Sequence, residues 1–189
     1  MADIDLSLVV AKLVDEMRKA GGPPTEEALN RLAAQIAKGF NAQKDEVAIL
    51  RLSADAKMLN FIFPIKLSKV GAIPLTLTQS LAAKTIRERR GEIVNTFSGY
   101  KHPTIFESIN LSEQERAAPI QKIVSVPMSA EGKVEGVIQI SRKARPGEAV
   151  GPDFTANDLA ELTMVGSILA KYLATQPPIP PPPPKAAKP

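Results

Sequence analysis

Residues 123–141, IVSVPMSAEGKVEGVIQIS, carry the strongest folding signal in the sequence. Two runs rich in β-branched residues, 123–128 and 134–141, flank a short polar interval at residues 130–132 that contains a glycine. β-Branched residues favour strands, and a glycine between two such runs favours a tight turn. This stretch therefore predicts an antiparallel β-hairpin.

Downstream of the hairpin, residues 155–172 predict a long helix. Thr155 and Asp158 have the spacing of a capping box, in which each side chain binds a backbone amide of the first turn. Apolar residues at three- and four-residue spacing form one stripe, namely Leu159, Leu162, Val165, Ile168, Leu169, Tyr172 and Leu173. The proline run that follows, residues 177–184, is compatible with polyproline II or disorder.

Upstream, two further helices are expected. Residues 4–20 form an amphipathic pattern, and the Gly-Gly-Pro-Pro sequence at residues 21–24 ends it. A second helix begins at Thr25, a good N-cap, which is followed by two glutamates in the first turn.

The middle of the chain alternates between strand and helix signals. We expect strands at 47–52, 58–65, 75–77 and 93–97, and a helix at 79–90. In the second of these strands, Leu59, Phe61, Phe63 and Ile65 are expected on one face, because side chains alternate across a strand. The predicted fold class is α+β, with five or six mostly antiparallel strands and the N- and C-terminal helices packed on one face of the sheet.

A long connection follows the last of these strands. Residues 98–109 form an expected loop of about twelve residues, longer than the usual 4–6, which indicates a lid or a binding loop. Ser112 and Glu115 then have capping-box spacing and predict another helix start.

Composition excludes several kinds of chemistry. The 189 residues include no cysteine, which excludes disulfides, thiolate nucleophiles and zinc–thiolate sites. The formal charge is +4, and the densest basic run, residues 87–90, is interleaved with acidic residues, so we expect no nucleic-acid binding. No apolar run is long enough to span a membrane, and the acidic N-terminus argues against a secretory signal. We therefore expect a cytoplasmic location and no membrane partner.

Three local stretches resemble hallmarks of the GAF domain family. They are residues 73–82 with 91–94, residues 123–128 with their Val-Pro ending, and residues 132–140 with 154–159. The resemblance covers about residues 25–174. It implies a GAF-like, PAS-related fold at residues 25–175, preceded by a helix (1–20) and a linker (21–24), and followed by a disordered proline-rich tail (176–189).

The resemblance also implies a small-molecule pocket between the sheet and the loops on one face. Family members bind cyclic nucleotides, tetrapyrroles, flavins, haem or metabolites, and others bind nothing and dimerise. Covalent tetrapyrrole attachment and the family's methionine-sulfoxide reductases both require cysteine, which this chain lacks. The Asn-Lys step of the cyclic-nucleotide binders is also missing. The cofactor, if there is one, stays unidentified.

Candidate ligand-binding residues come from the aromatic and polar positions near the predicted loop. They are Phe61, Phe63, Thr76, Thr78, Phe97, Tyr100, His102 and Phe106. His102 is the sole histidine, and it either contacts a ligand or haem iron, or is a surface residue. The aromatic residues either line a pocket or anchor the loop and the core.

Two hypotheses for function remain from the sequence. The first is a non-catalytic sensor domain that binds a small molecule non-covalently and signals through a dimeric helical interface to a separate, unidentified protein partner. The second is a scaffold without a ligand that dimerises through its terminal helices or docks through its proline-rich tail, where Pro180, Pro183 and Lys185 have the spacing of a proline-rich ligand. An unrecognised hydrolase or transferase is disfavoured, because no nucleophile–base pair and no Gly-x-Ser-x-Gly elbow is present.

Overall fold

The computed structural model describes residues 5–69, 71–97 and 118–181. Its helices are α1 (Leu6–Ala20), α2 (Glu26–Gly39), the short 3-10 helix η1 (Lys44–Glu46), α3 (Ile65–Ser68), α4 (Leu81–Glu88) and α5 (Ala156–Leu173). Its strands are β1 (Val47–Leu52), β2 (Met58–Phe63), β3 (Ala72–Pro74), β4 (Glu92–Val94), β5 (Ile120–Ala130) and β6 (Lys133–Lys143).

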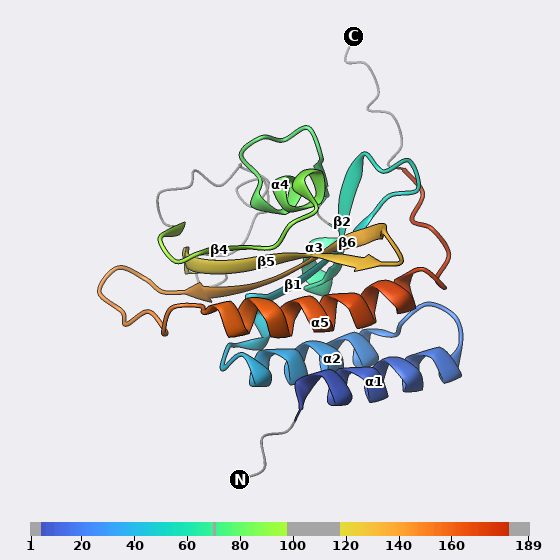
Figure 1. The fold of residues 1–189 in the computed structure, drawn as a ribbon, viewed down its shortest axis with the longest axis horizontal. Coiled ribbons are helices and arrows are strands. Elements are labelled where there is room, and N and C mark those ends of the chain that lie inside the picture. Colours follow the sequence, from blue (N-terminus) through green and yellow to red (C-terminus); the bar gives the residue numbers. More distant parts are fainter. Residues whose placement is uncertain (1–4, 70, 98–117, 182–189) are drawn as a thin grey trace.

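The six strands form one sheet in the order β3-β2-β1-β6-β5-β4, and neighbouring strands are antiparallel. Helices α2 and α5 cover one face of this sheet, and α1 packs on those two helices (Figure 1). Helix α4 lies across the opposite face (Figure 1). The predicted α+β class, and the placement of the terminal helices on one face, are thereby confirmed.

The helix ends follow from local side chains. The Asp5 carboxylate accepts hydrogen bonds from the backbone amides of Ser7 and Leu8, and α1 ends at Gly21, whose φ of 72° suits glycine. The Thr25 hydroxyl caps α2. The predicted capping box of α5 is present, with Thr155 Oγ1 accepting from Asp158 N and the Asp158 carboxylate accepting from Thr155 N.

The predicted hairpin is confirmed, and its strands are longer than expected. Strands β5 and β6 are joined at the Ala130–Lys133 pair by a two-residue turn. Both turn residues have positive φ, 53° at Glu131 and 78° at Gly132, which is the geometry that joins twisted antiparallel strands best.

Two strand predictions are wrong at their boundaries. Strand β2 stops at Phe63, because Pro64 has no amide proton for the ladder and Ile65 begins α3. The third strand lies at Ala72–Pro74 instead of 75–77, and the Leu77 amide turns back to bind the Pro74 carbonyl. The expected helix at 79–90 and strand at 93–97 are confirmed in shorter form as α4 and β4.

The expectation that Phe61 and Phe63 share a face is also wrong. Leu50 pairs with Phe61, whereas the preceding residue Ile49 pairs with Phe63, so β2 carries one extra residue, Ile62. Such a bulge reverses the alternation of side chains beyond it. Phe61 therefore packs toward α4, and Phe63 packs with the α1–α2–α5 side.

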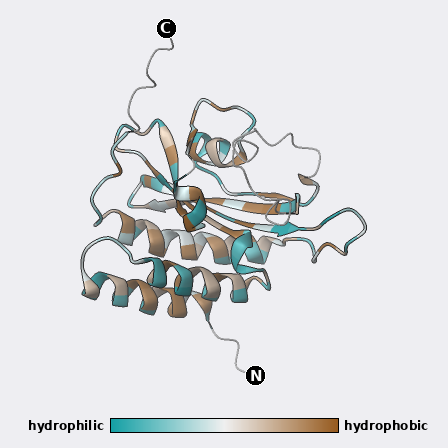
Figure 2. Cartoon of the chain, turned by 180° about the vertical axis from the view of Figure 1, so that it is seen from behind, coloured by the Kyte–Doolittle hydropathy of each residue, from teal (hydrophilic) through white to brown (hydrophobic). Residues whose placement is uncertain are grey.

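The main hydrophobic core lies between the sheet and the helix layer, and hydrophobic residues line both layers in Figure 2. Among its fully buried members are Val10, Leu32, Ile36, Val47, Val124, Ile138, Ile140 and Leu162. We call this side of the sheet the helix face and the opposite side the α4 face.

The tail after α5 differs in part from the expected disorder. Ile179 forms a parallel β-bridge with Ser53, and its carbonyl oxygen accepts a hydrogen bond from the Ala54 amide at 2.8 Å. Within the described residues, the chain up to Pro181 thus runs along the end of β1.

Candidate functional site

The alternation of β5 and β6 decides which side chains reach the α4 face. Val124 and Ile138 belong to the core of the helix face. Ser125 and Gln139 therefore point to the α4 face, and they are direct cross-strand partners. The Gln139 Nε2 atom donates a hydrogen bond of 3.0 Å to the Ser125 hydroxyl oxygen.

Helix α4 contributes a third residue, Thr85, to this polar group. The Thr85 hydroxyl lies 2.7 Å from that of Ser125, and it also donates to the Leu81 carbonyl oxygen at 2.9 Å. A hydroxyl has one proton, so Ser125 donates to Thr85 while it accepts from Gln139. We call Gln139, Ser125 and Thr85 the polar chain; its hydrogen bonds run in one direction, from Gln139 to the Leu81 carbonyl.

The polar chain reaches from the interior toward solvent. Ser125 is fully buried and Thr85 is 2% exposed, whereas Gln139 is half-buried. Ala48 is the β1 partner of Gln139. Ala48 and Ser125, the residues beside Gln139 on the two adjacent strands, are both small. The Gln139 amide is therefore the largest side-chain polar group among these three residues.

Apolar residues surround the polar chain on two sides. The cluster on the β1–β2 side has as its buried members Leu50, Leu59, Phe61, Leu67, Ile73, Ala82, Ala83, Ile86 and Val137. The cluster on the β4–β5 side consists of Leu81, Phe97 and Ile123. The polar chain is thus a hydrogen-bonded, uncharged group between two apolar clusters.

Two polar contacts hold α4 on this face, one from the middle of the helix and one from its last turn. Lys84 Nζ lies 2.6 Å from Glu92 Oε2, which joins α4 to the edge strand β4. Arg87 Nη1 donates a hydrogen bond of 2.6 Å to the Leu75 carbonyl oxygen, which fixes the segment between β3 and α4. The cover of the α4 face is therefore attached by polar contacts at its rim.

The sequence-predicted site residues are only partly brought together. Phe61 and Phe97 lie on the α4 face, in the two different apolar clusters. Phe63 lies on the helix face. Thr76 and Thr78 lie in the segment before α4, and both are exposed. The other three candidates, Tyr100, His102 and Phe106, lie outside the described residues, as do the predicted loop and the Ser112–Glu115 capping box.

The three residues of the polar chain were missed by sequence reasoning. Ser125 and Gln139 each interrupt a run of aliphatic residues in a predicted strand, and a polar residue at an inward position was an available signal. Their pairing follows from the hairpin register, because the two positions are directly opposite one another. Thr85 had no such signal, since its contact with Ser125 depends on where α4 lies.

The described part of the chain has neither a metal-ligand cluster nor a membrane-spanning helix. Within residues 5–69, 71–97 and 118–181, no three His, Asp or Glu side chains gather as metal ligands would. No helix in these same ranges has the length and apolar character needed to cross a membrane.

Comparison with known proteins identifies the family to which this fold belongs. A two-faced antiparallel sheet, with the terminal helices on one side and a short helix over a polar group on the other, is an α+β architecture. The family model described as GAF domain matches residues 24–173, and the chain belongs to the GAF domain family. GAF domains are in general regulatory or sensor domains of signalling proteins.

Solved structures agree on the fold. The chain is similar to the GAF domain of a Coxiella burnetii phosphoenolpyruvate-protein phosphotransferase (ptsP), at 12% identity, with 92% of this chain and 95% of that chain covered and a TM-score of 0.63. For the corresponding Acinetobacter GAF domain the identity is 14%, the coverage 90% and 93%, and the TM-score 0.61.

A third similar structure is fRMsr of Staphylococcus aureus in complex with substrate, at 18% identity, 88% and 95% coverage and a TM-score of 0.53. Because that protein acts on a substrate, the fold alone does not distinguish a regulatory domain from an enzyme. Comparison with curated protein sequences gave no match.

Proposed function

We propose that this chain is a non-catalytic regulatory domain that binds a small molecule non-covalently on the α4 face. The observation that carries the proposal is the polar chain, which ends at the half-buried amide of Gln139 between two apolar clusters. A domain that used this face for packing alone would gain more by filling it with aliphatic residues, because buried polar groups stabilise weakly even when hydrogen-bonded.

The chemistry of the face indicates the class of ligand. The polar chain is uncharged and lies between two apolar clusters. The charged neighbour of Ser125 on β4, Glu92, is neutralised by its ion pair with Lys84. Such a site suits a small, neutral molecule with an apolar body and an amide, carbonyl or hydroxyl group that pairs with Gln139. The absence of cysteine excludes attachment of the ligand through a thioether.

Native mass spectrometry of the protein purified gently from its host tests this proposal. A reproducible adduct of small-molecule mass, lost on denaturation, is the expected result. A protein that carries no adduct, and whose melting temperature does not respond to a library of neutral metabolites, would contradict it.

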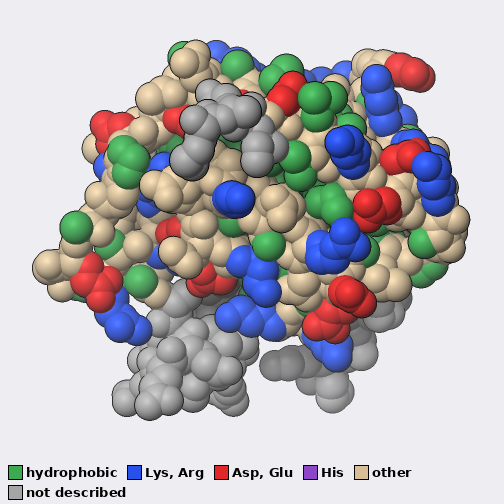
Figure 3. All heavy atoms as spheres, turned by 90° about the horizontal axis from the view of Figure 1, so that it is seen from below, with side chains coloured by type: hydrophobic (Ala, Val, Ile, Leu, Met, Phe, Trp, Pro, Cys, Tyr) green, Lys and Arg blue, Asp and Glu red, His purple; other side chains and the backbone are tan. Residues whose placement is uncertain are grey.

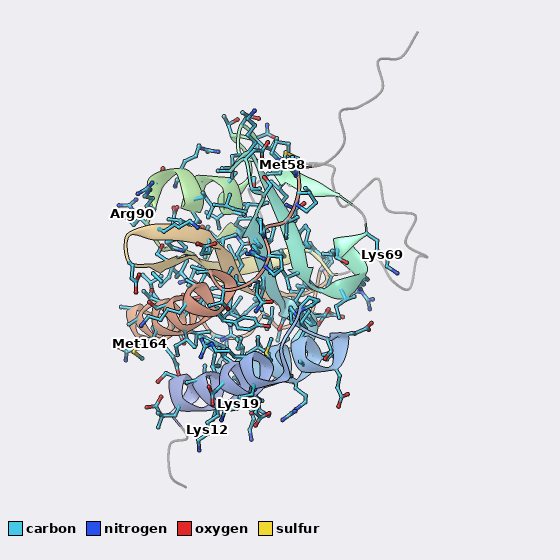
Figure 4. The ribbon with its side chains drawn as sticks, turned by 90° about the vertical axis from the view of Figure 1, so that its right-hand side faces the viewer. Lys12, Lys19, Met58, Lys69, Arg90 and Met164 are labelled. Carbon is cyan, nitrogen blue, oxygen red and sulfur yellow. The ribbon has the colours of Figure 1, made fainter. Side chains whose placement is uncertain are left out.

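A second candidate, a homodimeric scaffold, is favoured by the outer surface of the helix layer. Leu8 on α1 is 60% exposed, and Met164 on α5 is 52% exposed and lies at the margin of the molecule in Figure 4. Figure 3 shows this side, with hydrophobic side chains set among charges of both signs. Large exposed apolar side chains on two adjacent helices are typical of an interaction surface.

A shallow hollow of about 210 Å³ between α1 and α2 adds apolar surface on the same layer. Its lining is Leu13, Glu16, Met17, Ala20, Ala28 and Arg31. Glu16 and Arg31 form an exposed ion pair at 3.2 Å. Dimerisation through these helices would also carry a signal from the α4 face to a separate protein partner.

Light scattering at several concentrations tests dimerisation. We expect a dimer mass for the wild type and a monomer mass for a Leu8→Glu, Met164→Glu double variant. A monomer mass for the wild type at every concentration would leave the ligand-binding proposal in place and remove the scaffold.

A further inference from the structure

Arg51 is a buried arginine next to the C-terminal end of an otherwise apolar strand, β1. Its side chain is on the helix face at the C-terminal end of α5, and the residue is 8% exposed. Nη2 donates to the carbonyl oxygens of Leu173 and Gln176 at 2.8 and 2.9 Å, and Nη1 donates to that of Pro177 at 2.8 Å. A cation at this place is favourable, because the carbonyl end of a helix carries partial negative charge.

The chain after α5 is attached at a second point. The Ala54 amide, in the turn that follows β1, donates to the Ile179 carbonyl oxygen at 2.8 Å. We call residues 176–181 the strap. It is held at its start by Arg51 and near its middle by Ala54, and its prolines have no amide protons with which to pair elsewhere.

Several buried polar atoms around Arg51 have no hydrogen-bond partner among the described residues, and Nε of Arg142 is another such atom elsewhere. Tyr172 OH, Gln176 Oε1 and Asn60 Nδ2 are buried without a hydrogen-bond partner among the described residues. Asn60 is the cross-strand partner of Arg51. Unpaired buried polar atoms gain hydrogen bonds to water when a contact opens, so they lower the cost of opening this region.

A second buried arginine offers an internal comparison. Arg142, 7% exposed, donates to the carbonyl oxygens of Phe40 and Asn41 at the end of α2, and its guanidinium lies 4.6 Å from the Phe154 ring centre. The segment that Arg142 binds continues directly into η1 and β1 and is fixed on both sides by the fold. The strap, in contrast, follows the last described helix and is held by Arg51, by Ala54 and by the Gln176 amide, which donates to the Leu173 carbonyl oxygen.

We propose that Arg51 is a latch that couples β1 to the strap, so that displacement of β1 releases residues 176–181 from the domain. The position of Arg51 in the strand supports this coupling. Leu50 precedes it on β1 and is a buried member of the apolar cluster of the α4 face. One strand therefore carries a side chain of the α4 face and the residue that holds the strap, whether or not a ligand binds.

Two NMR measurements on the full chain report release: the hydrogen-exchange rate of the Ala54 amide and the heteronuclear NOE of the Ile179 amide. In Arg51→Met we expect Ala54 to exchange at least about tenfold faster and Ile179 to become as mobile as a free chain end. Arg51→Lys keeps the charge but cannot reach three carbonyls, and is expected to be intermediate. Arg142→Met, the matched control, should leave both signals unchanged.

The coupling is tested from the opposite face of β1. Leu50 and Leu59 are both fully buried in the same cluster, on adjacent strands. We expect Leu50→Val to lower the Ile179 NOE and Leu59→Val to leave it near the wild-type value. An unchanged Ile179 in Arg51→Met or Arg51→Lys would overturn the latch, and equal effects of the two leucine variants would overturn the coupling.

Discussion

The two faces of the sheet are built differently. On the helix face, the sheet and three helices share one continuous hydrophobic cluster, and the buried arginines Arg51 and Arg142 lie at its ends. On the α4 face, two smaller apolar clusters are separated by the polar chain, and the cover is a helix of eight residues. The helix face is thus a continuous apolar core, whereas the α4 face combines apolar packing with a hydrogen-bonded polar group, and it is there that we propose the ligand site.

The largest expected effects come from matched cavities on the two faces. Leu162→Ala on the helix face and Leu59→Ala on the α4 face each remove a fully buried leucine. We expect losses of about 2–5 kcal/mol in the free energy of unfolding, with Leu162→Ala the larger, because the short α4 can move into the space and the long α5 cannot. Urea unfolding of both variants measures this, and a larger loss for Leu59→Ala would reverse the comparison.

The next largest effect is expected at Gly136 on β6, where β1 and β6 pack closely against each other. An added Cβ at Gly136 would fall against the Leu50 carbonyl oxygen, and 2.8 Å from Met128 Cε. We expect Gly136→Ala to cost about 1–3 kcal/mol of unfolding free energy, because neighbouring strands must separate.

Gly166→Ala is the control for this substitution. An added Cβ on α5 there would meet the Pro127 carbonyl oxygen at an ordinary 3.4 Å. Thermal unfolding should show a clear loss for Gly136→Ala and a loss near zero, or a small gain, for Gly166→Ala.

Removing one serine hydroxyl on each side of the sheet compares the polar chain with an ordinary side-chain hydrogen bond. Ser125→Ala leaves Gln139 Nε2 and Thr85 Oγ1 each without one partner, and we expect a loss of about 1–3 kcal/mol in the free energy of unfolding. Ser167→Ala on α5 removes a half-buried hydroxyl that donates to the Ser129 carbonyl oxygen, and should cost less. Equal losses in denaturant unfolding would mean that the polar chain contributes no more than an ordinary side-chain contact.

The smallest effect concerns Tyr172 near Arg51. Its hydroxyl is buried without a hydrogen-bond partner among the described residues, so Tyr172→Phe should leave stability at neutral pH unchanged or slightly higher.

The pH dependence of this variant follows from the same burial, which raises the pKa of Tyr172 above its ordinary value of 10.0. In the wild type the unfolded chain then loses its proton first, so stability is complete below about pH 10 and falls as the pH rises further. Urea unfolding at about pH 8 and pH 10.5 should show a steeper loss for the wild type than for Tyr172→Phe.

The parts of the fold that the sequence predicted depend on local signals. The apolar run of β1, the turn at Glu131 and Gly132, and the Thr155–Asp158 capping box each act within a few residues. The errors arose where a residue's position depends on contacts with a segment that is distant in the sequence. The bulge at Ile62 depends on pairing with β1, and it moved Phe63 to the other face.

The candidate site was harder to predict for the same reason. Of the predicted residues, Phe61 and Phe97 lie on the α4 face, in separate clusters. The polar chain joins residues 40 positions apart through the packing of α4, which no local pattern encodes. Arg51 was likewise visible as a charge inside an apolar strand, but the tail carbonyls that it binds lie more than 120 residues away.

The division of roles between the faces is tested most directly by native mass spectrometry of three proteins purified side by side from the host: the wild type, Ser125→Ala and Ser167→Ala. We predict a small-molecule adduct on the wild type and on Ser167→Ala, with the adduct reduced at least about tenfold on Ser125→Ala, because a neutral ligand group loses its ordered partner. An adduct retained equally by all three proteins would contradict the assignment of the ligand site to the α4 face.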